Sequence, residues 1–385
     1  WSPMSAAATF QIVWVAADLA TVLMLWNVLC RLGARRWQAT VATVLVSSNP
    51  LFISSESFLR YETAVTFLVT ASVFTFARYV SAPSLRRFAL FCAVLFVGVS
   101  TRTLLHPLWL LGGLGFGVIV AKRAGALSIR LVWPAALTVA LVVGNLAYLN
   151  VRFGNTGYSS YAGMNLERIA VTTLPDATLE RLQREGTLSD LASQKPYSPY
   201  DDYERLRPSL AHCEPAWRTS ALAGLRKSTG EPNLNAVCFD AIYRQAFDDS
   251  IAAIRAEPGN YLRSIGQAAV LFASWPAPFD HPSAGSFDVL ETIYKPILGP
   301  VHVSHDVGGG DPQATTAFLV GGLDRLPLLV TVVGALVLAL WRGAASTWRL
   351  AQRRRRPGDE IRIWIGFTVA AVGFASVVFD FYENA

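Results

Sequence analysis

Charged residues are scarce in this chain. Asp, Glu, Lys and Arg make up 16% of its 385 residues, whereas hydrophobic residues make up 52%. Soluble globular domains carry about 25% charged residues, so this composition excludes an ordinary soluble protein and indicates a membrane protein with a polar insertion.

Cysteine is scarce as well, and no metal-binding pattern is present. The four cysteines fit no zinc spacing, and His302 and His305 form an isolated H-x-x-H, which supplies too few ligands for a metal site. Cys213 and Cys238 both fall in a polar segment, where an oxidising compartment would allow a disulfide; two free, buried thiols are the alternative.

Long hydrophobic stretches account for most of the remaining chain. A membrane-spanning helix needs roughly 20 apolar residues, and lipid offers no partners for backbone polar groups, so such stretches are expected to be helical. Strand signals are weak throughout. The predicted fold class is therefore all-α: a polytopic transmembrane helix bundle with a large, irregular, mostly helical extracytoplasmic domain. The candidate spans lie near 8–30, 38–54, 62–80, 88–103, 105–121, 131–149, 316–341 and 362–380.

The basic residues of the short connections all fall on one side of this predicted bundle. Cytoplasmic loops of membrane proteins are enriched in Lys and Arg, which fixes the orientation. Residues 150–315 have a net charge of −5 and the rest of the chain +11, so the positive charge indicates anionic lipid headgroups as its partner and gives no support to nucleic-acid binding. The loop residues are Arg31, Arg35, Arg36, Arg78, Arg86, Arg87, Lys122, Arg123, Arg130, Arg342, Arg349 and Arg353 to Arg356.

This orientation predicts three regions in a multi-pass protein of the cell inner (plasma) membrane. Residues 1–149 form a bundle of six transmembrane helices, 150–315 an extracytoplasmic domain, and 316–385 two further transmembrane helices joined by a basic cytoplasmic loop. Within the polar segment, 240–257 has helical periodicity, and 261–275 forms a second, amphipathic run.

Ionisable residues gather where the predicted helices reach the outer face. Charges at membrane depth are costly and suggest function. Two cationic side chains on a short turn before Pro107 would suit an anionic headgroup, because Arg binds phosphate with paired hydrogen bonds. The alternative is interfacial snorkelling with a local Glu–Arg pair. These residues are Glu56, Arg60, Glu62, Arg102 and His106.

A second polar group follows the sixth span. Asn165, Glu167 and Arg168 could contact a headgroup or a sugar, although a helix start with Asn165 as its cap is an equal alternative.

Several short segments along the chain share the pattern of one known family. They are Ser48-Asn49-Pro50 with Tyr61-Glu62-Thr63, 101–109 (TRTLLHPLW), 159–166 (SSYAGMNL) with Asn150 and Phe153-Gly154, Asn233-Leu234-Asn235 and Pro258-Gly259-Asn260-Tyr261. Together they resemble the GT-C class of integral-membrane glycosyltransferases, which take sugars from polyprenyl-phosphate carriers, and the resemblance covers nearly the whole chain.

The resemblance implies direct sugar transfer on the extracytoplasmic face to an envelope glycan, lipid or protein acceptor. A carboxylate would deprotonate the acceptor, and Arg60, Arg102 and His106 would stabilise the leaving phosphate. The family's acidic first outer loop has no counterpart here, so the main catalytic base is expected upstream of Trp1, with Glu56 and Glu62 as candidates within the chain. Some members use a divalent metal; no cofactor is certain.

Two other functions remain open from the sequence. A non-catalytic membrane subunit would use the outer domain for docking. A transporter of lipid-linked substrates would place its binding groups near the bilayer midplane, often in repeated halves, and no repeat is visible.

Overall fold

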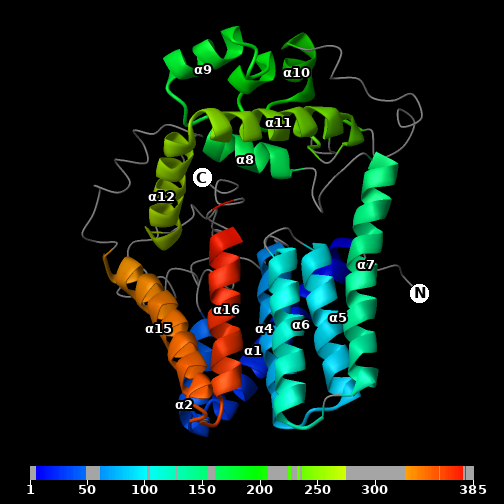
Figure 1. Ribbon diagram of the computed structural model, residues 1–385, viewed down its shortest axis with the longest axis vertical. Coiled ribbons are helices and arrows are strands. Elements are labelled where there is room, and N and C mark those ends of the chain that lie inside the picture. The colour runs from blue at the N-terminus through cyan, green and yellow to red at the C-terminus, as the bar shows by residue number, and fades with distance from the viewer. Residues whose placement is uncertain are drawn as a thin grey trace. The chain divides into compact units, whose positions relative to one another are not determined.

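The structure is a computed structural model, and every regular element in the residues it describes is helical (Figure 1). These residues are 6–48, 61–101, 105–126, 128–153, 161–206, 224–226, 232–234, 236–274, 326–354, 356–375 and 378. An isolated bridge between Arg226 and Pro232 is the one β-type pairing among them. The all-α prediction is therefore confirmed for this part of the chain. The chain divides into two compact units, the first within 1–143 and 273–373 and the second within 144–272 and 374–385.

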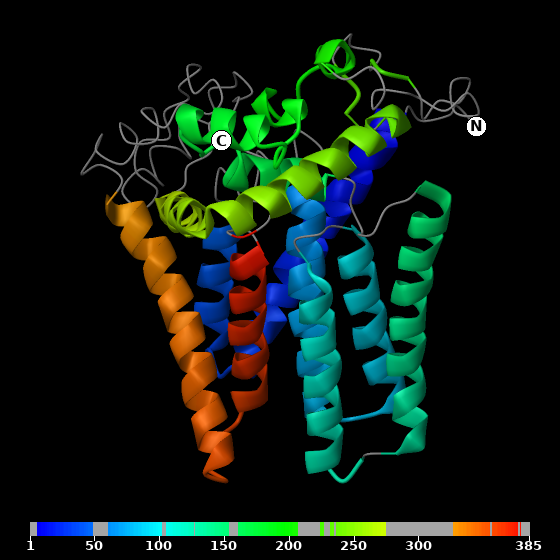
Figure 2. The same ribbon diagram turned by 45° about the horizontal axis from the view of Figure 1, so that its top comes forward.

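The first unit is a bundle of apolar helices. Helix α4 packs against both α1 and α5, and α5 lies between α6 and α7 (Figures 1 and 2). Within the described residues, three helical segments are long and apolar enough to cross a membrane: Ala8–Arg31, Thr63–Ser81 and Ile129–Val151. The helices of this bundle are α1 (Ala6–Arg31), α2 (Arg36–Ser47), α4 (Tyr61–Ser81), α5 (Leu85–Thr101), α6 (Pro107–Arg123), α7 (Ile129–Phe153), α15 (Leu326–Ala351) and α16 (Asp359–Ala375). Helix α7 from 144 onwards and the last two residues of α16 are assigned to the second unit.

Aromatic rings pack around the fully buried Trp364 in the core of this unit. Its ring centre lies 5.7 Å from that of Phe76, 5.5 Å from that of Phe91 and 5.7 Å from that of Trp109. Glycines on α6 make room for these large side chains, since a Cβ at Gly113 would approach Trp364 to 2.9 Å. Small residues of this kind let apolar helices pack closely without a polar contact.

Helices α15 and α16 touch backbone to backbone. A Cβ on Gly343 would lie 3.2 Å from the Cα of Gly366, and one on Gly366 would lie 3.0 Å from the carbonyl oxygen of Ala339. At the connection between these helices, the buried Asp359 carboxylate accepts hydrogen bonds from Arg349 at 2.6 Å and from Ser346 at 3.0 Å. Both contacts hold the two helices at this turn.

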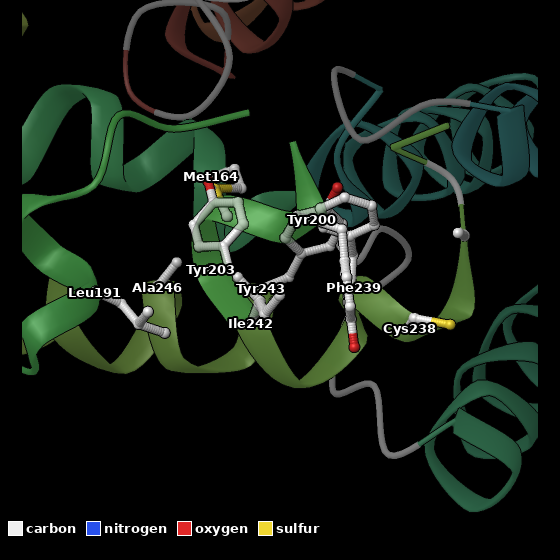
Figure 3. Close-up of a cluster of buried hydrophobic side chains, with 10 residues drawn as sticks. Met164, Leu191, Tyr200, Tyr203, Cys238, Phe239, Ile242, Tyr243 and Ala246 are labelled. Atoms are coloured by element: carbon white, nitrogen blue, oxygen red, sulfur yellow. The ribbon is translucent and has the colours of Figure 1, made fainter. Parts of the chain in front are cut away.

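The second unit is built on the packing of α8 against α11. Buried side chains from α8, α10, η3 and α11 form its core, in which the Phe239 ring stacks on that of Tyr243 with centres 5.5 Å apart (Figure 3). A Cβ on Gly163 would lie 1.9 Å from the carbonyl oxygen of Tyr243, so only glycine allows this approach. The elements are α8 (Ala162–Ala170), α9 (Asp176–Arg184), η1 (Asp190–Ser193), α10 (Tyr200–Leu206), η3 (Val237–Phe239), α11 (Asp240–Ala256) and α12 (Pro258–Ser274).

Several predicted helices match the observed ones, and one alternative was wrong. The predicted run 240–257 corresponds to α11, and 261–275 lies mostly within α12. Helix α15 continues beyond the predicted span 316–341, to Ala351. Asn165 does not cap a helix, because α8 already begins at Ala162 with Tyr161 as its N-cap.

Candidate functional site

The structure describes the side chains of three predicted substrate-binding residues. His106 belongs to the first unit, and Asn165 and Arg168 belong to the second. Glu62 lies in the first turn of α4, and nothing is described of its side chain. Glu56, Arg60, Arg102 and Cys213 lie outside the described residues.

Asn165 and Arg168 meet at one side chain, that of Tyr197. The Tyr197 hydroxyl donates a hydrogen bond to Oδ1 of Asn165. The guanidinium carbon of Arg168 lies 5.2 Å from the centre of the Tyr197 ring, which is a cation–π contact. Residues three apart on a helix share a face, so α8 presents both side chains to the same neighbour.

Tyr197 is held in an unusual backbone conformation. Its φ of 64° falls in the left-handed region, which is unfavourable for a residue with a Cβ. The Tyr161 ring stacks on the Tyr197 ring with centres 6.0 Å apart and an interplanar angle of 29°. Backbone strain of this kind persists only where the surroundings enforce it, and it is common at binding and catalytic sites. We refer to Tyr161, Asn165, Arg168 and Tyr197 as the Tyr197 cluster.

The Tyr197 cluster is buried on one side and accessible on the other. Asn165 is only 6% exposed, whereas Tyr161, Arg168 and Tyr197 are each partly exposed. A guanidinium beside aromatic rings offers paired hydrogen bonds for a phosphate or hydroxyl and an apolar face for a sugar ring. The arrangement is chemically suited to a sugar phosphate.

A buried carboxyl group lies on the same helix. Glu167 is 2% exposed, and its Oε2 has no hydrogen-bond partner. Burial, and then the negative charge of Asp249, raise the pKa of Glu167 well above its ordinary value. Asp249 itself accepts hydrogen bonds from the Ser189 N–H at 3.0 Å and from Gln245 at 3.1 Å. Burial and the neighbouring carboxylate therefore favour the protonated form of Glu167 over its carboxylate form.

His106 has a structural role in the first unit. It is the N-cap of α6, and its Nδ1 accepts a hydrogen bond from the Leu108 N–H at 3.2 Å. Its ψ of 150° is the extended conformation that Pro107 imposes on the preceding residue. The prediction that His106 is not helical is confirmed, while the sharpness of the turn and the phosphate contact of His106 stay predictions.

Of the two cysteines predicted to form a disulfide, the structure describes only Cys238. Cys238 is disulfide-bonded, whereas Cys30 and Cys92 are free. Because Cys213 lies outside the described residues, its pairing with Cys238 stays a prediction.

No metal cluster is found in the described part of the chain, where no group of three or more His, Cys, Asp or Glu side chains could hold an ion. His302 and His305 fall outside that part.

Tyr197 and Asp249 were missed from the sequence. The one local signal for Tyr197 is its place between Pro196 and Pro199, which marks a turn without indicating which helix it meets. Asp249 follows Asp248 in the middle of α11, where acidic residues are usually solvated.

Comparison with family models, with characterised proteins and with solved structures finds no match to this chain.

Proposed function

We propose that this protein is a membrane glycosyltransferase that moves a sugar from a polyprenyl-phosphate donor to an acceptor on the extracytoplasmic face. The observation that carries the proposal is the meeting of Asn165 and Arg168 at Tyr197. Both residues were expected to contact a headgroup or sugar, and the cluster supplies the mixed aromatic, amide and cationic surface that such a ligand needs.

The apolar helices support the lipid part of the proposed donor. A polyprenyl chain partitions into the bilayer, so an enzyme that uses it must place its binding groups next to membrane-embedded helices. Three helices of suitable length and composition are present among the described residues. The proposal includes all eight predicted spans, with 150–315 on the extracytoplasmic side.

In the proposed reaction the acceptor hydroxyl attacks the anomeric carbon of the sugar and the polyprenyl phosphate leaves. A general base removes the hydroxyl proton, and cationic groups stabilise the charge that develops on the phosphate. We assign the phosphate contacts to Arg60, Arg102 and His106. The sugar contacts are assigned to Asn165 and Arg168. Glu56 and Glu62 are the candidates for the base within the chain.

Donor binding tests the proposal without requiring the base. The full chain would be reconstituted in vesicles and titrated with polyprenyl-phosphate-linked hexoses and pentoses. Arg168→Ala should weaken donor binding at least tenfold, because a hydrogen bond to a charged group contributes about 1.5–3 kcal/mol. Arg168→Lys should restore only part of the loss, because lysine lacks the planar fork.

Arg184→Ala is the matched control, since Arg184 is an exposed arginine of α9 outside the Tyr197 cluster. Its donor affinity should equal that of the unmodified protein. Equal affinity of the Arg168→Ala protein, or no saturable binding of any donor by the unmodified chain, would refute the proposal.

A further inference from the structure

An apolar groove of about 590 Å³ runs between α5 and α7 in the first unit. The two helices lie side by side in both ribbon views (Figures 1 and 2). The volume falls within the range of about 300–1,000 Å³ that is usual for sites of small organic ligands. It therefore has room for part of a lipid.

The groove is lined by side chains on the facing sides of α5 and α7. Leu85 and Ala93 line it from α5, and Trp133 and Leu137 line it from α7. Spacings of four and eight residues place each set on one face of its helix. Because Ala93 is small, α5 does not fill the space opposite the large α7 side chains.

Its lining side chains are unusually exposed for their size. Trp133 is 72% exposed, Leu137 59% and Leu85 45%. Exposing these three apolar side chains to water would cost free energy, so an apolar molecule is expected to cover the groove.

Positive charge is concentrated at one end of the groove. Arg130, in the first turn of α7, is the one ionisable group among the lining residues apart from the Cys92 thiol. Leu85, the first residue of α5, lines the same end and is followed directly by Arg86. Trp133 lies about one turn further along α7, and tryptophan prefers the depth at which headgroups meet hydrocarbon.

We propose that this groove binds a hydrocarbon chain of an anionic glycerophospholipid, whose phosphate pairs with Arg130. A lipid without a phosphate would leave Arg130 unpaired. A zwitterionic lipid such as phosphatidylcholine carries a phosphate but also brings an ammonium group, which repels the basic end. A free phosphate would leave the apolar walls uncovered. The basic end is the one predicted to face the cytoplasm, so the lipid belongs to the cytoplasmic leaflet. This site is separate from the proposed sugar transfer and does not depend on it.

Photo-crosslinking tests the site in the full chain. The protein would be reconstituted in phosphatidylcholine vesicles that contain a trace of phosphatidylglycerol or phosphatidylcholine with a photoreactive acyl chain, and the labelled peptides would be mapped by mass spectrometry. Phosphatidylglycerol should label 85–96 and 130–141 at least fivefold more than phosphatidylcholine does. Arg130→Ala should abolish that preference.

Two further variants separate the roles of charge and space. Arg123→Ala removes an exposed arginine outside the groove lining and should leave the labelling unchanged. Ala93→Phe should fill the groove and reduce labelling by both lipids, because Ala93 is exposed and the added ring enters the open space.

Equal labelling by the two lipids, a preference that survives Arg130→Ala, or displacement of the label by polyprenyl phosphate but not by excess phosphatidylglycerol would each overturn the proposal.

Discussion

Arg168 lies with its guanidinium carbon 5.2 Å from the centre of the Tyr197 ring, and the hydroxyl of the same ring donates to Asn165. One tyrosine therefore orients two polar residues of α8. A change at Tyr197 should act on both of them, although it lies about 30 residues further along the chain.

Tyr197→Phe should loosen α8 while leaving the ring contacts intact. The substitution removes the hydroxyl that donates to the buried Asn165, and losing a donor to a buried acceptor costs about 1–3 kcal/mol. Hydrogen exchange in peptides that cover 162–170 should become faster by about tenfold or more. Tyr148→Phe, at an exposed tyrosine of α7, should leave these rates unchanged; the prediction fails if both variants behave alike.

Gly163→Ala should destabilise the second unit by at least about 2 kcal/mol, because the new Cβ would overlap the carbonyl oxygen of Tyr243 and force α8 away from α11. Gly266→Ala is the matched control in α12, where a Cβ meets nothing within 4 Å. The control should be neutral or stabilise by up to about 1 kcal/mol, through helix propensity. Thermal unfolding in detergent compares the two, and similar melting temperatures would contradict the proposed close packing.

Glu167 should make stability depend on pH. Its pKa is raised in the folded state by burial and by Asp249, against 4.5 as the ordinary value. The folded chain thus binds the proton more tightly, and its stability should fall as the pH rises above about 4.5 towards the folded-state pKa.

Glu167→Gln mimics the protonated form, so this variant should match the unmodified protein near pH 4.5 and be the more stable of the two at pH 8. Glu180→Gln, at an exposed position of α9, should show no such divergence. Melting curves at several pH values test this prediction. If the Glu167→Gln protein were less stable than the unmodified protein at pH 8, the pKa of Glu167 would not be raised by burial.

Asp359→Asn should weaken the turn between α15 and α16. The Asp359 side chain is fully buried beside Arg349 and Arg362, which are 24% and 22% exposed. Burial opposes its charge, but hydrogen bonds from Arg349, Arg356 and Ser346 outweigh this and lower the pKa of Asp359 to about 2. Its contribution should therefore be complete above the ordinary value of 3.8 and be lost as the pH falls towards 2.

At pH 7 the loss should be about 1.5–3 kcal/mol, because the substitution removes a buried, charged acceptor of several hydrogen bonds. Arg354→Ala, at an exposed residue of the same turn, should change the melting temperature little. If the two substitutions lowered the melting temperature equally, the ion pairs of Asp359 with Arg349 and Arg362 would not stabilise the turn.

Hydropathy predicted where most helices lie because apolar runs of the required length have few alternatives to helix in lipid. Hydropathy does not show where α15 ends, because the apolar run stops before Arg342 whereas the helix continues to Ala351. Arginine and alanine are good helix formers, and Asp359 neutralises Arg349, so the helix continues to Ala351.

The polar site was only partly predictable. Asn165 and Arg168 share a helix face at a spacing of three, which the sequence contains, so their proximity could be predicted. Their common partner Tyr197 could not be, because its left-handed backbone and its contact with α8 depend on tertiary packing. The buried state of Glu167 likewise depends on α11, which carries Asp249.

Gly343 and Gly366 link the close packing of α15 and α16 to the ion pair between Arg349 and Asp359. Since the backbones of α15 and α16 meet there, any bulkier side chain would wedge the helices apart and pull Arg349 away from Asp359. Divergent relatives should therefore keep both glycines together with the Asp359 ion pairs, or replace both features. Substitutions at the two places should covary.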